Sequence, residues 1–190
     1  MQPGWIYEVV ASTRGERGPH AAPIGILTPD GERLKAELYQ GSTTLANIGR
    51  HGVFGINLVH DPVMLHKALH HRDRLRFTTD GQAPGATTPF LEGADAWLEL
   101  EACLKPGQEN TVIMEAGLAR CRQLGPVSLI NRAKGLLLES LVLSTRRHIL
   151  PVEHVRDQLL ENARVIAKVA PGSSYAEAVR ELLAEAGLAP

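Results

Sequence analysis

The sequence predicts a mainly β fold with an α-helical extension: an antiparallel barrel or sandwich followed by three helices. Up to about residue 125, short segments that alternate apolar and polar residues, or are rich in Val, Ile and Tyr, follow one another between turns, as is typical of β-strands. After Gly125-Pro126 the apolar residues recur with the period of a helix. We therefore expect two domains, a β domain over residues 1–125 and a helical subdomain over residues 126–190.

Strands are expected in six segments, which are Trp5–Thr13, His20–Thr28, Glu32–Tyr39, Gly52–Val59, Trp97–Leu104 and Thr111–Arg122. Asp30-Gly31 is a two-residue hairpin signal between the second and third segments. Pro23 removes a backbone donor from the second segment, which indicates an edge strand or a bulge.

Two short helices are expected inside the β domain. The first covers Gly41–Gly49. The second begins with Asp61 as N-cap and Pro62 at the first helical position, and it runs to about His71. Residues 72–90 are polar and rich in Gly and Pro, so we expect them to be mostly loop.

The extension is expected to hold three helices, with breaks at Pro151 and at Pro171-Gly172. The first helix includes Leu136–Leu143, which is too apolar for a helix surrounded by water, so we expect it to pack on the barrel or on another subunit. Ser174 and Glu177 have the spacing of a capping box and predict the start of the last helix.

The composition, with 44% hydrophobic and 22% charged residues, is that of an ordinary globular protein. The net charge of −1 gives no basic field and 4% aromatic residues are too few for a base-stacking surface, so nucleic acid is not an expected partner. The N-terminus has no signal-peptide pattern, and the most apolar stretch, Gly135–Leu143, is too short to cross a bilayer. We expect a cytoplasmic protein that does not enter a membrane. Cys103 and Cys121 lack the spacing of a metal or redox pair, and we expect buried thiols.

Gly41-Ser42-Thr43-Thr44 is the first candidate site, a turn from a strand into a helix. The first N–H groups of a helix lack partners inside the helix, and its N-terminus carries a partial positive charge, so phosphate groups bind there. A serine or threonine at this position is also the usual N-cap of a helix. The residues alone leave both interpretations open.

The segment Ala21-Ala22-Pro23-Ile24-Gly25 is the second candidate, because small residues and a missing N–H would let a flat ring lie against the strand. An edge strand with a bulge explains the same residues equally well. Asn57 stands in an otherwise apolar strand, where a buried amide needs hydrogen-bond partners. Those partners are backbone groups or a ligand, and backbone groups are slightly favoured.

Other polar clusters have simple structural explanations. His66 and His70 stand four residues apart on the expected second helix, but no third ligand is evident, so we expect no metal site. The run Asn131–Gly135 places two cations at the start of a helix, where an anionic ligand or a salt bridge would compensate them. Serine-hydrolase, dinucleotide-binding and phosphate-loop motifs are absent from the sequence. The catalytic residues stay unknown, and His20 and His60 are candidates for a proton donor.

The motifs together resemble the FMN-binding split-barrel superfamily, whose members include flavin reductases and pyridoxamine-phosphate oxidases. The resemblance is carried by residues 13–25, by Gly41-Ser42-Thr43-Thr44-Leu45-Ala46-Asn47-Ile48, by Asn57 and by Asp61-Pro62. With Asn131–Gly135 and Glu139 before a long helix, the chain resembles one prokaryotic branch that carries a helical C-terminal extension and is catalogued as a domain of unknown function.

This resemblance implies a homodimeric split barrel with FMN in a groove at the dimer interface. By that similarity Ala22, Pro23 and Ile24 would lie along the isoalloxazine ring. The turn at Gly41 would hold the phosphate and ribityl chain through Ser42, Thr43, Thr44 and Asn47, with Asn57 nearby. His20 stands where many relatives have asparagine, which puts a contact from that position in doubt.

The leading hypothesis is an FMN-binding flavoprotein, an oxidoreductase that reduces a small molecule at the expense of NADH, NADPH or another donor. One alternative is a non-catalytic module that binds FMN. Another is an enzyme of one-carbon pterin cofactor synthesis that uses the same groove without flavin, because the branch is associated with that synthesis in some genomes. The sequence identifies neither the substrate nor the donor.

Overall fold

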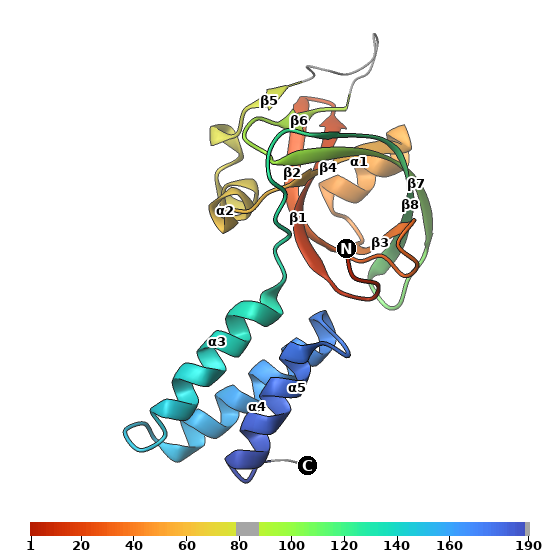
Figure 1. Cartoon of the computed structure of the whole chain (residues 1–190). Helices are drawn as coiled ribbons and strands as arrows, with labels where there is room; N and C mark the ends of the chain where they lie inside the picture. Colours follow the sequence, from red (N-terminus) through yellow and green to blue (C-terminus); the bar gives the residue numbers. More distant parts are fainter. Residues whose placement is uncertain (79–87, 189–190) are drawn as a thin grey trace. The chain divides into compact units, whose positions relative to one another are not determined.

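The computed structural model describes residues 1–78 and 88–188, and the chain divides into two compact units (Figure 1). The β unit consists of residues 1–3 and 7–130, and the helical unit consists of Gly4–Ile6 and the chain from Asn131 onward. Gly4–Ile6 joins the helical unit because the Ile6 N–H donates to the Val169 carbonyl over 2.9 Å. The first strand consequently begins at Tyr7 and not at Trp5.

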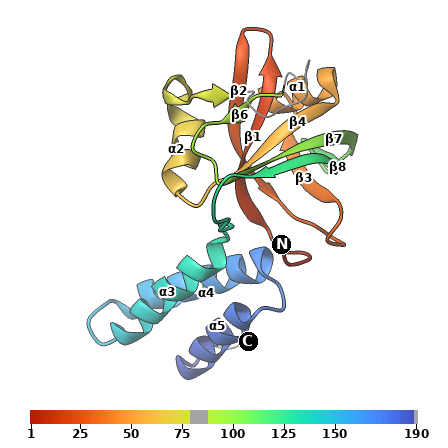
Figure 2. The same ribbon diagram turned by 45° about the horizontal axis from the view of Figure 1, so that its top comes forward.

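A six-stranded antiparallel sheet forms the β unit, with the strand order β2-β1-β4-β7-β8-β3 (Figure 2). The strands are β1 (Tyr7–Gly15), β2 (Gly18–Ile26), β3 (Leu34–Tyr39), β4 (Val53–Leu58), β7 (Ala96–Pro106) and β8 (Thr111–Gln123). All six predicted strands are confirmed. A separate small sheet pairs β5 (Phe77–Thr78) with β6 (Phe90–Leu91), inside the stretch expected to be mostly loop. Residues 79–87 of that stretch lie outside the described residues.

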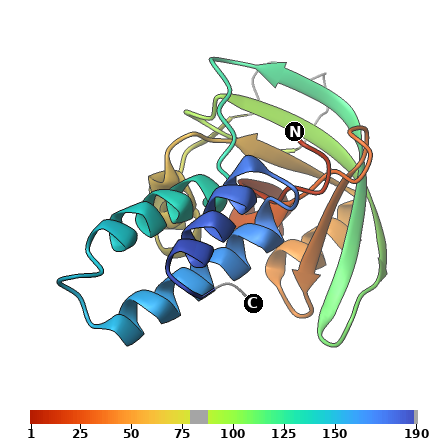
Figure 3. The same ribbon diagram turned by 60° about the horizontal axis from the view of Figure 1, so that its bottom comes forward.

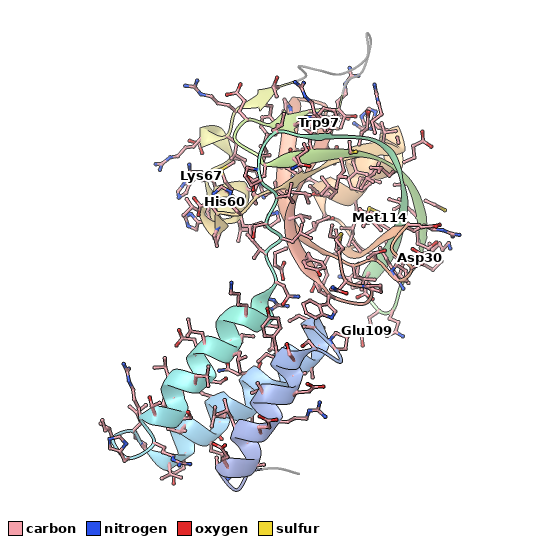
Figure 4. The ribbon with its side chains drawn as sticks, viewed as in Figure 1. Asp30, His60, Lys67, Trp97, Glu109 and Met114 are labelled. Carbon is pink, nitrogen blue, oxygen red and sulfur yellow. The ribbon has the colours of Figure 1, made fainter. Side chains whose placement is uncertain are left out.

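The two edge strands of the sheet meet at one point, so the sheet curls into a half-barrel. Leu27 and Lys35 exchange both backbone hydrogen bonds, at 2.9 and 2.8 Å. The connection over residues 28–34 is wider than the two-residue hairpin that Asp30-Gly31 predicts, and that prediction is wrong. The Asp30 carboxylate accepts the N–H groups of Glu32 and Arg33, both at 2.9 Å, and these bonds shape the longer loop (Figure 4 labels Asp30).

Pro23 lies on an edge strand, as expected, because β2 is the first strand of the sheet order. Successive residues of a strand direct their backbone groups to opposite sides. Leu27 directs its groups toward β3, so Pro23, four residues earlier, directs its own away from β1 as well. A residue without an N–H therefore costs the sheet no hydrogen bond at this position.

The helices α1 (Thr43–His51) and α2 (Pro62–His70) pack on opposite faces of the β1–β2 pair. α1 contacts the face that carries Thr13, because the Asn47 side chain donates to the Thr13 hydroxyl. α2 covers the other face, where Ala68 clusters with Val10 and Ala21. A short 3₁₀ turn over Arg72–Arg74 follows α2.

The helical unit contains α3 (Arg132–Thr145), α4 (Val152–Val169) and α5 (Ser174–Glu185), so three C-terminal helices are present as expected (Figure 3). The capping-box prediction is wrong by one residue, because Ser173 caps α5 by accepting the Ala176 N–H. Among the described residues, no helix combines the length and the apolar character that a membrane span requires.

Both cysteines are exposed, which corrects the expectation of buried thiols. Cys103 pairs with Glu115 across β7 and β8, so the side chains of these two residues lie on the same face of the sheet. Cys121 lies in the second half of β8, beyond the point where β3 ends opposite Ala116. The alternation of apolar and polar residues along the sequence of β8 did not show that the side chains in this half of the strand are exposed.

Candidate functional site

The turn into α1 combines an N-cap with backbone donors that stay open. Gly41 has a φ of +77°, a conformation that favours glycine, and it turns the chain from β3 into the helix. The Ser42 hydroxyl accepts the Leu45 N–H over 3.3 Å, so this serine is the N-cap. In the described chain, the N–H groups of Thr43 and Thr44 have no hydrogen-bond partner, and the first turn of α1 carries no acidic residue. The turn can therefore still accept an anion.

Side-chain contacts fasten α1 to the β1–β2 hairpin. Near the middle of the helix, Asn47 donates to the buried hydroxyl of Thr13 over 2.9 Å. At its start, the Thr44 hydroxyl lies 3.3 Å from Nε2 of His20. At its end, the Arg50 guanidinium pairs with the Glu16 carboxylate at 2.8 Å. These contacts fix the side of α1 that faces the hairpin.

A cavity of about 420 Å³ lies between the hairpin and α1. It is lined by residues 15–20 together with Thr43, Asn47 and Arg50. Arg17 has no ion-pair partner within the described part of the chain, whereas Arg50 is paired with Glu16. The cavity thus offers a hydroxyl, an amide, a free guanidinium and, beside it, open helix N–H groups. Such a set matches a phosphate group.

His20 lies at the edge of this cavity and is half-buried. Burial, and secondarily the positive charge of Arg72, hold the pKa of His20 below its ordinary value of 6.5. Arg72 is fixed nearby, because its Nε donates to the Ala21 carbonyl over 3.0 Å. His20 is therefore a neutral imidazole near pH 7.

The predicted residues Ala22, Pro23 and Ile24 lie on the free edge of β2 and are partly exposed. His20, Ala22 and Ile24 alternate along the strand and share one face, the face that α1 contacts. Pro23 points to the opposite face. Two of the three residues therefore continue the surface that begins at the cavity.

Asn57 lies apart from this group, because it is completely buried on the Val10 face of the sheet. Its amide donates to the Val10 carbonyl at 3.0 Å and to the Ser12 hydroxyl at 2.9 Å. Its side-chain oxygen accepts the Leu91 N–H over 2.7 Å. Asn57 thus joins β4 to β1 and to β6, and the structure does not bring it to the α1 turn.

The other polar clusters have structural partners. Asn131 caps α3 by accepting the Ala133 N–H at 2.8 Å, and it donates to the carbonyls of Ile6 and Val169. The His60 ring lies 2.9 Å from Asp95 beside α2 (Figure 4). In residues 1–78 and 88–188, no group of three or more His, Cys, Asp or Glu side chains could hold a metal ion.

The residue patterns alone missed the hairpin side of the site, which entered the sequence analysis only through the resemblance carried by residues 13–25. The residues at the turn of the hairpin, Glu16 and Arg17, were expected only as part of a loop. Thr13 was expected only as the end of a strand. The hydrogen bond between Asn47 and Thr13 joins positions that are 34 residues apart in the sequence, and no local sequence pattern predicts such a contact.

The fold is that of a flavin reductase-like split barrel. The β unit is similar to the flavin reductase of a styrene monooxygenase from Pseudomonas putida, at 21% identity and a TM-score of 0.52 over 64% of this chain and 82% of that one. It is also similar to an NADH:FAD oxidoreductase from Streptomyces globisporus, at 12% identity and a TM-score of 0.52 over 66% and 80%. These two likenesses establish the fold alone.

The chain belongs to the family described as protein of unknown function (DUF447). Residues 7–122 match the profile of its N-terminal domain, and residues 131–184 match the profile of its C-terminal part. An FMN-bound protein of this family from Methanosarcina mazei is 25% identical, with a TM-score of 0.55 over 97% of this chain and 96% of that one. The resemblance inferred from the sequence motifs is thereby confirmed.

Proposed function

We propose that this protein is an FMN-binding flavoprotein. The observation that carries the proposal is the cavity between the β1–β2 hairpin and α1, with its hydroxyl, amide and guanidinium groups. The similarity to an FMN-bound family member over nearly the whole chain supports it. The open N–H groups of Thr43 and Thr44 fit a phosphate monoester, and the cavity of about 420 Å³ falls in the range of ligand sites.

Each part of the site would bind one part of the cofactor. The phosphate would accept hydrogen bonds from the backbone N–H groups of Thr43 and Thr44 and from the Thr43 hydroxyl, and it would contact Arg17. Asn47 would lie beside the ribityl chain, and the ring would lie along the free edge of β2 at Ala22–Ile24. Asn57 would act only as a positioning residue, since it holds the strand next to that edge.

We propose further that the protein is an oxidoreductase acting on a small molecule, with NADH or NADPH as the donor. Bound FMN would supply the hydride chemistry, and the protein would bind and orient it. His20 is neutral and half-buried at the edge of the cavity, so it can donate a hydrogen bond without adding charge. A non-catalytic FMN module is the alternative, and reduction of the bound flavin distinguishes the two.

The second half of β8 supports a homodimer. β3 pairs with β8 only up to Ala116, so residues 117–123 have a free edge, and every one of them is exposed. Leu118 and Leu124 are 52% and 50% exposed. An uncovered strand edge with apolar side chains is usually paired or covered in a native assembly.

The test is reconstitution of the purified chain with FMN and with riboflavin, which lacks the phosphate. Thr43→Ala combined with Arg17→Gln should weaken FMN binding about tenfold or more and leave riboflavin binding unchanged. Arg33→Gln, at an exposed position of the 28–34 loop, is the matched control and should change neither. Equal loss for both flavins would place the phosphate elsewhere, and no saturable flavin binding at all would contradict the proposal. Bleaching of bound FMN by NADH or NADPH would support the oxidoreductase role.

A further inference from the structure

The helical unit contains a cavity that the proposed flavin site does not use. Its volume is about 220 Å³, and its lining residues come from the end of α3, the start of α4 and the end of α5. These three helix ends lie at the bottom of Figure 1. A dry cavity of about 150 Å³ is large enough to bind benzene. This cavity therefore has room for a small ring or a short chain that carries one substituent.

The inner wall of the cavity is apolar. Val155 and Leu159 of α4 are only 6% and 1% exposed, and Leu182 of α5 completes this wall. Val155 and Leu159 also belong to the smaller apolar cluster of the unit. Filling the cavity with an apolar group would extend that cluster and remove its surface from water.

The mouth of the cavity carries two arginines. Arg147 and Arg156 both line it, and neither has a hydrogen-bond or ion-pair partner among the residues that the structure describes. By contrast, Arg164 on the same helix is paired with Glu161 at 2.7 Å. Guanidinium groups bind carboxylates through paired hydrogen bonds. Glu185 also lines the cavity, so its charged side chains leave a single net positive charge, which favours a monoanion over a dianion.

We propose that this cavity binds a small apolar monocarboxylate. The ring or chain lies against Leu159 and Leu182, and the carboxylate contacts Arg147 and Arg156. The site lies entirely within the helical unit, so the inference does not depend on flavin binding.

The test is a titration of the full chain, labelled at its Leu and Val methyl groups, with benzoate and with benzamide. Benzamide has the same size and shape without the charge. Benzoate should give saturable NMR shifts at Val155, Leu159 and Leu182, with an affinity about tenfold higher than that of benzamide. Absence of saturable shifts, or equal affinities for the two compounds, would overturn the proposal.

Two variants locate the site. Arg147→Gln combined with Arg156→Gln changes only exposed side chains, so the chain should still fold, and it should weaken benzoate about tenfold. Lys168→Gln, exposed on the same helix but outside the cavity, is the control and should leave the affinity unchanged. Leu182→Trp would fill the cavity and should abolish the shifts from both compounds. Unchanged benzoate binding in the double variant would refute the assignment even if the tryptophan variant did not fold.

Discussion

The β unit buries more polar side chains than the helical unit does: among the described residues, eight are buried in the β unit and three in the helical unit. In the β unit, polar side chains are buried: Ser12, Thr13 and Asn57 are at most 1% exposed, and each has a hydrogen-bond partner. Both units also expose large apolar side chains, such as Leu118 of the β unit at 52%, and Leu138 and Ile149 of the helical unit at 60% and 72%. A buried polar group requires one specific partner, whereas an exposed apolar group requires only a covering surface. Each buried polar side chain of the β unit therefore depends on one particular partner, whereas an exposed apolar side chain such as Leu138 does not.

This comparison can be measured because each unit holds one of the two tryptophans. Trp5 belongs to the helical unit and packs near Tyr175, at 5.9 Å between ring centroids. Trp97 belongs to β7 and stacks on Phe90. Variants with Trp5→Phe or Trp97→Phe leave a single tryptophan, and its fluorescence during urea unfolding then reports on one unit at a time.

The largest effect is expected from an apolar side chain inside the helical unit. Leu159→Ala should lower the free energy of unfolding by about 2–5 kcal/mol, because it leaves a cavity among Val155, Leu183 and its other neighbours. Leu138→Ala should change it by less than about 0.5 kcal/mol, because that side chain is exposed. Trp5 fluorescence measures both. Similar losses from the two variants would show that Leu138 is covered in solution and would break the contrast between the units.

A buried amide of the β unit comes next. Asn57→Ala leaves the Leu91 N–H and the Val10 carbonyl without their partner in the core, which should cost about 3 kcal/mol. Asn110→Ala, at an exposed position, is the control, with a change below about 0.5 kcal/mol. Trp97 fluorescence during urea unfolding separates them. If Asn57→Ala lowered the free energy of unfolding no more than the control does, the buried hydrogen bonds of Asn57 would not stabilise this unit.

Two glycines of the β unit test how closely its interior is packed, with a smaller expected change in the free energy of unfolding. A Cβ at Gly55 would come within 2.5 Å of the Ser12 hydroxyl and 2.7 Å of the Phe90 ring, so Gly55→Ala should destabilise the β unit by about 1–3 kcal/mol. A Cβ at Gly49 would meet Leu104 at an ordinary 3.7 Å. Gly49→Ala should therefore stabilise the unit by about 0.5–1 kcal/mol, through helix propensity. Thermal unfolding of both variants checks the opposite signs.

The smallest effect concerns pH. The pKa of His20 is lowered in the folded chain, so the unfolded chain takes up the proton first as the pH falls. The stabilising contribution of neutral His20 is fully present above pH 6.5, and it is lost as the pH falls from there toward the lower folded pKa. His20→Gln should flatten the decline of unfolding free energy in that interval. His154→Gln, in exposed surroundings on α4, should leave the decline unchanged.

Local sequence signals predicted the elements well. The alternation of the strands, the Asp61-Pro62 helix start and the Ser42 cap act within a few residues, and the structure contains all of them. The course of the loop at Asp30-Gly31 was not predictable from the dipeptide, because the Asp30 side chain competes with a tight turn for backbone donors.

From residue patterns without the family resemblance, the phosphate end of the candidate site was predictable only on one side. The α1 turn stood out because its hydroxyls are adjacent in sequence. Arg17 and Thr13 come from the hairpin, and their place beside α1 depends on strand pairing over long separations. The burial of Asn57 against Ser12 depends on the register of β1 and β4 in the same way.

The assignment of Gly4–Ile6 to the helical unit has a consequence for biosynthesis. Ile6 leaves the ribosome before the helices of its unit do, and the amide of Asn131 that bonds its carbonyl follows 125 residues later. At about 5–20 residues per second, that partner emerges roughly 6–25 s afterwards. Throughout that interval Gly4–Ile6 has no unit to join. Removal of Gly4–Ile6 would therefore impair a unit whose helices are synthesised much later than these residues.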